Sequence, residues 1–147
     1  MCLYTTQDKQ LTAEADKTVF KVVVFRASQA FTPYTDTPIS YETLNGQKPF
    51  KANGKTQKYP DFFGFSINGG NIHTYATAAQ AFAIAPLLKE WGQPAVYECI
   101  IPKGTKYYYG SAYSKNSPAY ASKQIRFVKR LHSPYESKPK QTELDLR

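Results

Sequence analysis

The alternation of apolar and polar positions along the chain predicts about six β-strands. The clearest strand covers residues 18–26, with the sequence TVFKVVVFR, because Val and Phe suit a pleated sheet. An apolar run at 95–101 and an aromatic run at 106–109 flank a Pro-Lys-Gly turn, which is typical of paired strands. The expected strands are 18–26, 39–44, 72–75, 95–101, 106–109 and 124–131, and the aromatic segment 61–67 is expected to pack on the core.

One principal helix is predicted after the strand at 72–75. Thr77 is placed to cap it, with Gln80 as the capping-box partner three residues later. Alanines favour the helix, Pro86 kinks it or ends its first half, and Gly92 and Pro94 stop it. The segments 27–39, 46–60 and 110–121 are expected to be loops. The fold class that follows is α+β, a mostly antiparallel sheet with the helix on one face, in a single domain of residues 1–132 with a polar tail at 133–147.

The composition of the 147 residues supports a β-rich protein, since aromatic residues make up 15% and twelve are Tyr. An apolar run of eighteen residues is absent, so we expect no membrane span. The N-terminus lacks the basic and apolar regions of a signal peptide, which favours a cytoplasmic location. Cys2 and Cys99 form no disulfide framework and no metal-binding spacing, so we expect free thiols and no metal.

The net charge of +8 is concentrated in two segments that contain no acidic residue. Residues 46–59 carry four lysines, and residues 102–131 carry seven basic residues. A clustered positive field attracts polyanions such as nucleic acids, nucleotides or acidic proteins. The alternative is a solvated surface that keeps the protein soluble. The candidate basic surface consists of Lys103, Lys106, Lys123, Arg126 and Arg130.

Three residues could carry chemistry. Glu98 lies inside an apolar, strand-like run and is either solvent-facing or a carboxylate that polarises a sugar hydroxyl. Arg26, at the end of the first long strand, is either a solvated edge charge or an anion clamp. His73 is either a hydrogen-bonded structural residue or a group that holds a ribose hydroxyl or acts as a base. Cys99 could also be a nucleophile with His73 as its base, or it could be a buried, inert thiol.

The order of these residues resembles the skeleton of the ADP-ribosyltransferase fold. The resemblance rests on Phe25-Arg26, on the strand IHTY at 72–75, and on the segment YECIIPKGTKY at 97–107. It implies an NAD contact for Arg26, a nicotinamide pocket lined by His73, Thr74 and Tyr75, and a catalytic Glu98 that engages the ribose 2′-hydroxyl. Val96 stands where active members often carry a second Glu or Gln. The leading hypothesis is therefore a domain that binds NAD or a related nucleotide, with or without surviving catalysis.

A second resemblance is to small uncharacterised proteins of gut Bacteroidales and their phages. It is carried by the opening MCLY, by IHTY at 72–75, by CIIPKGTKYY at 99–108 and by YAS at 120–122. It implies a phage or mobile-element accessory role in the cytoplasm of a bacterial host cell, such as interference with host defence through a host protein. The competing hypothesis is a non-enzymatic module in which basic residues and Tyr107–Tyr109, Tyr113 and Tyr120 grip nucleic acid or an acidic partner. A structural virion or inhibitor protein is a third.

Overall fold

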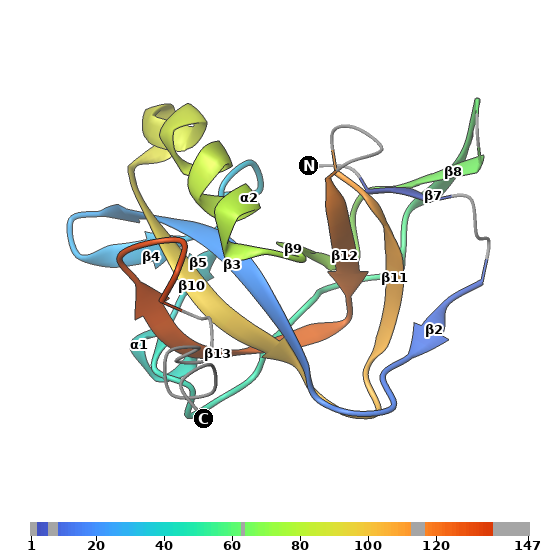
Figure 1. Cartoon of the computed structure of the whole chain (residues 1–147), viewed down its shortest axis with the longest axis horizontal. Helices are drawn as coiled ribbons and strands as arrows, with labels where there is room; N and C mark the ends of the chain where they lie inside the picture. Colours follow the sequence, from blue (N-terminus) through green and yellow to red (C-terminus); the bar gives the residue numbers. More distant parts are fainter. Residues whose placement is uncertain (1–2, 6–8, 63, 113–116, 137–147) are drawn as a thin grey trace, which may run out of the picture.

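The computed structural model describes residues 3–5, 9–62, 64–112 and 117–136, which form thirteen strands and three short helical segments (Figure 1). The elements of the first half are β1 (Leu3–Thr5), β2 (Leu11–Thr12), β3 (Lys17–Arg26), β4 (Gln29–Phe31), β5 (Pro38–Ile39), α1 (Tyr41–Leu44), β6 (Phe50–Lys51), β7 (Lys58–Asp61) and β8 (Gly64–Ile67). Those of the second half are β9 (Ile72–Tyr75), α2 (Ala78–Ile84), the 3-10 helix η1 (Ala85–Trp91), β10 (Gln93–Ile101), β11 (Lys106–Ser111), β12 (Pro118–Ser122) and β13 (Gln124–Leu131).

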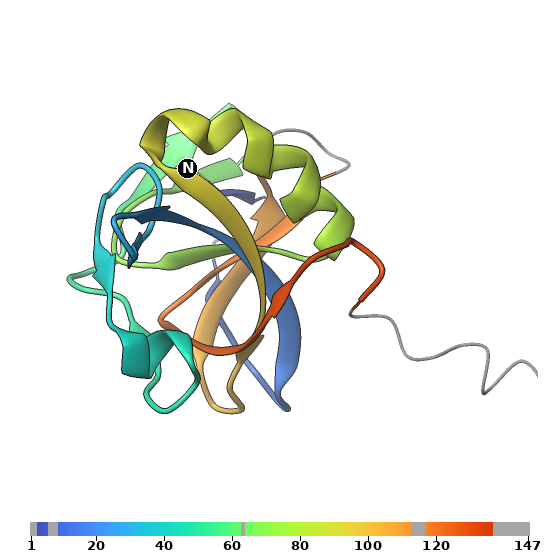
Figure 2. The same cartoon turned by 90° about the vertical axis from the view of Figure 1, so that its left-hand side faces the viewer.

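All the described strands join one sheet, and every pairing between them is antiparallel. The main order is β6-β13-β10-β3-β9-β12-β11-β1-β8-β7, with β2 beside β11 and with β4 and β5 added along β3. Figure 2 shows how strongly β3 and β10 curve, with α2 and η1 across one side of the sheet. The sheet is therefore a curved roll rather than a flat layer.

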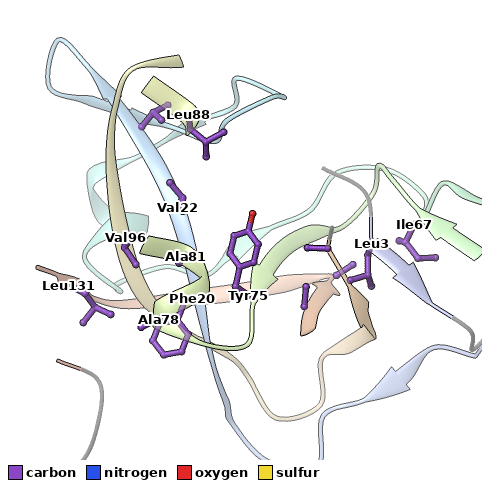
Figure 3. Close-up of a cluster of buried hydrophobic side chains, with 14 of the residues drawn as sticks. Leu3, Phe20, Val22, Ile67, Tyr75, Ala78, Ala81, Leu88, Val96 and Leu131 are labelled. Carbon is purple, nitrogen blue, oxygen red and sulfur yellow. The ribbon is translucent and has the colours of Figure 1, made fainter. Parts of the chain in front are cut away.

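β3 lies at the centre of the sheet and is buried on both faces from Val19 to Val24. Phe20 and Val22 face a cluster that α2 and η1 cover through Ala78, Ala81 and Leu88 (Figure 3). The alternate residues Val19 and Val23 face a second cluster inside the roll. The second cluster also contains Tyr97, Cys99, Ile125 and Phe127 from β10 and β13. A continuous apolar run is what a strand with no solvent-facing side requires.

The expected α+β class with six strands is wrong, because strands make up 49% of the structure and helix only 14%. The fold is predominantly β. The additional strands are two to five residues long. Five of them, β4, β5, β6, β7 and β12, lie wholly or mostly in the segments expected to be loops, 27–39, 46–60 and 110–121, and β1, β2 and β8 lie outside these segments. Such short strands carry too few residues for a visible alternation, and their pairing with distant strands stabilises them.

Other local predictions had mixed outcomes. The capping box of Thr77 and Gln80 is confirmed, but α2 is α-helical only to Ile84, and Pro86 lies in the 3-10 segment that follows. The strand expected at 39–44 is wrong beyond Ile39, because Ser40 caps the short helix α1 through its hydroxyl. Of the segment 61–67, expected to pack on the core, Ile67 is fully buried in the first cluster, whereas Phe62 is 90% exposed. The segment belongs to a hairpin whose first strand, β7, is exposed throughout.

Of the two cysteines, Cys99 is a free thiol, and Cys2 lies outside the described residues. Of the tail at 133–147, residues 137–147 lie outside them as well. Within the described part of the chain, none of the helices combines the length and the apolar character needed to cross a membrane.

Candidate ligand-binding site

The sheet opens along one edge of β3. On that edge β3 pairs with β9 only at Phe20, opposite Tyr75, and with β4 only from Val24 onward. The segment between these pairings has a strand partner on its other edge alone, where β10 runs alongside. A cavity of about 450 Å³ lies at this opening. Its volume is within the range of small-molecule sites.

Four parts of the chain line the cavity around the opening. They are Lys21 and Val22 of β3, the β4–β5 connection through Thr32–Thr35 and Thr37, the segment from Phe50 to Asn53 with Gln57, and the stretch from Asn68 to His73 with Tyr75. Leu88 of η1 adds an apolar contact. None of the described residues that line the cavity is an Asp or a Glu. The lining therefore supplies two ammonium groups, from Lys21 and Lys51, together with hydroxyl, amide and imidazole groups.

Lys21 is the decisive residue of this lining. Its side chain is only 8% exposed, and its Nζ donates a hydrogen bond to the backbone oxygen of His73 at 2.9 Å across the opening. Burial lowers the pKa of Lys21 from 10.5 to about 8, and the Cys99 thiol partly opposes this shift. At neutral pH the Lys21 amine is therefore mostly protonated, and its hydrogen-bond acceptor, the His73 backbone oxygen, carries no charge.

His73 lies beside this ammonium on β9. Its Nε2 is 2.8 Å from the backbone oxygen of Asn68, so Nε2 carries the proton and donates it. Burial lowers the pKa of His73 to about 4; the Asn68 hydrogen bond opposes this, and the charge of Lys21 adds to it. The imidazole is therefore neutral, and its buried Nδ1 is an acceptor with no hydrogen-bond partner among the described residues.

Asn71 has a second unpaired acceptor in the same wall. Its Nδ2 donates to the Thr56 hydroxyl at 3.2 Å, whereas its buried Oδ1 has no hydrogen-bond partner in the part of the chain that the structure describes. Buried polar atoms are normally hydrogen-bonded, so two unpaired acceptors in one cavity wall are unusual. A ligand that reaches them has to supply donors, such as hydroxyl or amino groups.

Close contact between two chain segments holds this wall in place. Gln57 and Asn68 are joined by a backbone hydrogen bond of 2.8 Å, and Gln57 also donates to Gly69. Gly70 has a φ of +78°, and a Cβ there would lie 2.1 Å from the backbone oxygen of Lys55. Only glycine fits this crossing. Lys123 reaches the same turn, because its Nζ donates to the Gly70 oxygen at 2.6 Å.

The structure brings together two of the five residues proposed for nucleotide binding and catalysis. His73 and Tyr75 line the cavity. Thr74 points to the other face of β9 and is fully buried, outside the lining. Arg26 lies beyond the opening at the end of β3, and Glu98 is on β10, opposite Phe20; neither lines the cavity.

Arg26 instead joins two other parts of the fold. Its guanidinium pairs with Asp36 at 2.7 Å, donates to the backbone oxygen of Trp91 at 2.7 Å, and lies 3.9 Å from the centre of the Phe31 ring. These contacts occupy guanidinium N–H donors of Arg26 that would otherwise bind an anion. Glu98 is half-buried on the face of Phe20, opposite Lys129 of β13, whereas its neighbours Tyr97 and Cys99 face the second cluster.

The Cys99–His73 pair does not have the surroundings of a nucleophile and base. Cys99 is fully buried, and its Sγ lies 3.7 Å from the backbone oxygen of Tyr97. Burial raises the pKa of the Cys99 thiol, although Lys21 opposes the shift. A protonated thiol inside the core is an apolar packing group.

The candidate basic surface divides into two groups. Lys103, Lys106 and Lys123 lie at the end of the sheet where the β10–β11 and β12–β13 turns meet, and the Lys123 N–H donates to the Lys106 oxygen at 3.0 Å. Arg126 and Arg130 lie along β13, where Arg130 stands 5.7 Å from the centre of the Phe25 ring.

Lys21 and the Asn residues of the wall were missed in the sequence. A signal for Lys21 was present, because it interrupts the apolar run 18–26 as Glu98 interrupts 95–101. Comparison of the chain with protein-family models, curated proteins and solved structures finds no match. The functional argument therefore rests on the residues of this cavity, and both resemblances stay predictions.

Proposed function

We propose that the protein binds a small anionic ligand of the nucleotide type in the cavity between β3 and β9. The observation that carries this proposal is the buried ammonium of Lys21. Removing such a charge from water costs several kcal/mol unless an opposite charge compensates it. The described lining offers only the neutral His73 carbonyl, so a phosphate or carboxylate group of a ligand would complete the pair.

The remainder of the lining favours a ligand with both an anionic and a hydroxyl-bearing part. Asn71 and His73 each keep an unpaired acceptor, which suits ribose hydroxyls or a base amino group. Lys51 adds a second cation, and Tyr34, Phe50 and Tyr75 supply apolar surface for a ring. A mononucleotide combines these features at a size that the cavity volume permits.

Binding, rather than ADP-ribosyl transfer, is the activity that this geometry supports. ADP-ribosyl transfer, as the resemblance implies it, needs Arg26, His73 and Glu98 to contact the same NAD molecule. Arg26 is engaged by Asp36 and Trp91, and Glu98 stands on a different strand outside the lining. Catalysis by Glu98 stays a prediction without support from the cavity.

The test compares ADP with adenosine by thermal unfolding and isothermal titration calorimetry. ADP at one hundred times its Kd should stabilise the protein by about 2.7 kcal/mol, a rise of roughly 8 °C in Tm. Adenosine, which lacks the anion, should raise the Tm far less. Lys21→Met should abolish the ADP effect, whereas Lys129→Met, on the exposed side of β13, should retain it.

A second test of the proposal measures the uptake of protons when the ligand binds. An anion beside Lys21 raises the pKa of its ammonium, so ADP binding at pH 8.5 should take up protons from the buffer. Calorimetry in buffers of different ionisation enthalpy measures that uptake. Equal Tm shifts in the wild type and in Lys21→Met, or no response to ADP, AMP, NAD and inorganic phosphate, would overturn the proposal.

A further inference from the structure

The register of the sheet places five tyrosines from distant parts of the sequence on one face. In an antiparallel sheet, directly paired residues project to the same side, as do alternate residues along a strand. Tyr59 pairs with Ser66, Ser66 with Tyr4, and Tyr4 with Ser111. Alternate positions on β11 and the pairing with β12 extend the row. The tyrosine face comprises Tyr4, Tyr59, Tyr107, Tyr109 and Tyr120.

This face is open to solvent at three of its five tyrosines, whereas Tyr107 and Tyr120 are half-buried against the second cluster. Tyr59, Tyr4 and Tyr109 are 50%, 46% and 45% exposed. Tyr108, which lies between the two tyrosines of β11, projects to the opposite face and is buried there. The strands concerned, β7, β8, β11 and β12, form the right-hand part of Figure 1, away from α2. A row of exposed aromatic rings on a monomeric surface marks an interaction site more often than a folding requirement.

Three of the rings are in contact with one another. The centre of the Tyr120 ring lies 5.1 Å from that of Tyr109 and 5.9 Å from that of Tyr107, in tilted and edge-on arrangements. Tyr4 and Tyr59 project to the same face two strands apart, at roughly twice the 4.8 Å spacing of neighbouring strands, with Ser66 of β8 between them. A sheet that presents two or three such rings is a known platform for unstacked bases.

Positive charge is concentrated at one end of this row. The Nζ of Lys17 lies 5.4 Å from the centre of the Tyr120 ring. Lys103 and Lys123 lie in the adjacent turns. Lys106 begins β11 and, as the neighbour of Tyr107, projects to the opposite face, where its Nζ donates to the Thr12 hydroxyl at 2.9 Å. The acids at this end are Glu14 and Asp16, and a carboxylate oxygen of Asp16 already accepts from the Lys103 N–H. At the far end of the row, Asp61 adds one negative charge.

We propose that the tyrosine face binds single-stranded nucleic acid, with bases stacked on the tyrosines and phosphates near the lysines at its end. The choice of single-stranded nucleic acid follows from the exposed rings and the neighbouring lysines together. Exposed rings stack on bases of any sequence, and neighbouring ammonium groups attract the phosphates between them. A base-paired duplex hides its base faces and does not fit a row of rings.

The experiment measures fluorescence anisotropy with labelled dT12, rU12 and a 12-base-pair duplex at 50 mM salt. We expect both single strands to bind more tightly than the duplex, and the affinity to fall with added salt. Tyr4→Ala and Tyr109→Ala should each weaken binding by about tenfold. Tyr4→Phe and Tyr109→Phe, which keep the ring, should bind nearly as the wild type does. Lys17→Met should reduce the salt dependence.

Two controls separate this site from the rest of the molecule. Tyr41→Ala removes a tyrosine on α1 that is 80% exposed and outside the row, so dT12 should bind as before. Lys21→Met acts in the cavity and should leave dT12 binding unchanged, which keeps this inference independent of the cavity ligand. Unchanged binding in Tyr4→Ala and Tyr109→Ala, a preference for the duplex, or binding of poly-glutamate but not of dT12 would overturn the inference.

Discussion

At the scale of single residues, the two charges inside apolar strands have different surroundings. Glu98 stands on the outer face of β10, half-exposed and opposite Lys129. Lys21 stands on β3, which is buried on both faces, and its ammonium is held by one carbonyl. A charge in the central strand thus has no solvent side to turn to, whereas a charge one strand away does. Lys21 is the residue whose burial most needs an explanation.

Replacing Lys21 by Met should stabilise the protein at neutral pH. Burial lowers the pKa of Lys21 from 10.5 to about 8, so the unfolded chain binds more protons between these values. The stability of the wild type relative to Lys21→Met therefore rises with pH, by about 3 kcal/mol in total between pH 7 and 10.5. Urea denaturation at several pH values measures this difference.

The comparison with Lys21→Met needs its own control. Cys99, whose thiol pKa burial raises, remains in both proteins, and His73 stays neutral throughout this range. The matched control is Lys129→Met, which removes an exposed ammonium instead of a buried one and should leave the pH dependence of the stability close to that of the wild type, because an exposed ammonium keeps its hydration on folding. A constant difference for Lys21→Met as well would mean that the Lys21 ammonium is solvated in the folded state.

At the scale of elements, the long strands were predictable and the short ones were not. The pattern placed β9 and β13 at their observed limits, and placed β3, β10 and β11 to within two residues. These strands have enough residues for an apolar run or an alternation to be visible. The hairpin from β3 to β4 was missed because its two-residue turn, Ala27-Ser28, lacks the usual Asn-Gly signal.

The turn at Ala27 and Ser28 offers a stabilising substitution. Their φ values of 51° and 70° are both in the left-handed region, as a type I′ hairpin turn requires, and neither residue favours it. Ala27→Asn with Ser28→Gly should raise the free energy of unfolding by about 1 kcal/mol, measured by urea denaturation. The same pair of substitutions at Glu14 and Ala15, an exposed connection, is the matched control and should give no gain. A loss of stability at Ala27 and Ser28 would show that the strain is absent.

At the scale of the whole molecule, the cavity could not be read from residue order. Its walls come from β3, the β4–β5 connection, the segments around Phe50 and Asn68, and η1, which meet only through the curvature of the sheet. Arg26, His73 and Glu98 follow one another along the chain, yet the structure separates them. Arg26 lies beyond the opening, and Glu98 lies one strand away on β10. The tyrosine face likewise depends on pairings between β1, β8 and β7 that no local pattern reveals.

The same topology predicts how stability is distributed over the sheet. β3 and β10 are paired along nine consecutive positions and lie inside the sheet, whereas β7 is an edge strand with all four residues exposed. In native-state hydrogen exchange, the amides that join β3 to β10 should exchange only through global unfolding. The amides of the β7–β8 hairpin should exchange through local opening, at least a hundredfold faster.

Val23→Ala, at a fully buried position, should lower the global stability by about 2 kcal/mol. It should therefore speed exchange in β3 and β10 about thirtyfold and leave the hairpin unchanged. Equal acceleration in both regions would mean that the β7–β8 hairpin unfolds together with the core, so that the tyrosine face is as rigid as the strands around Lys21.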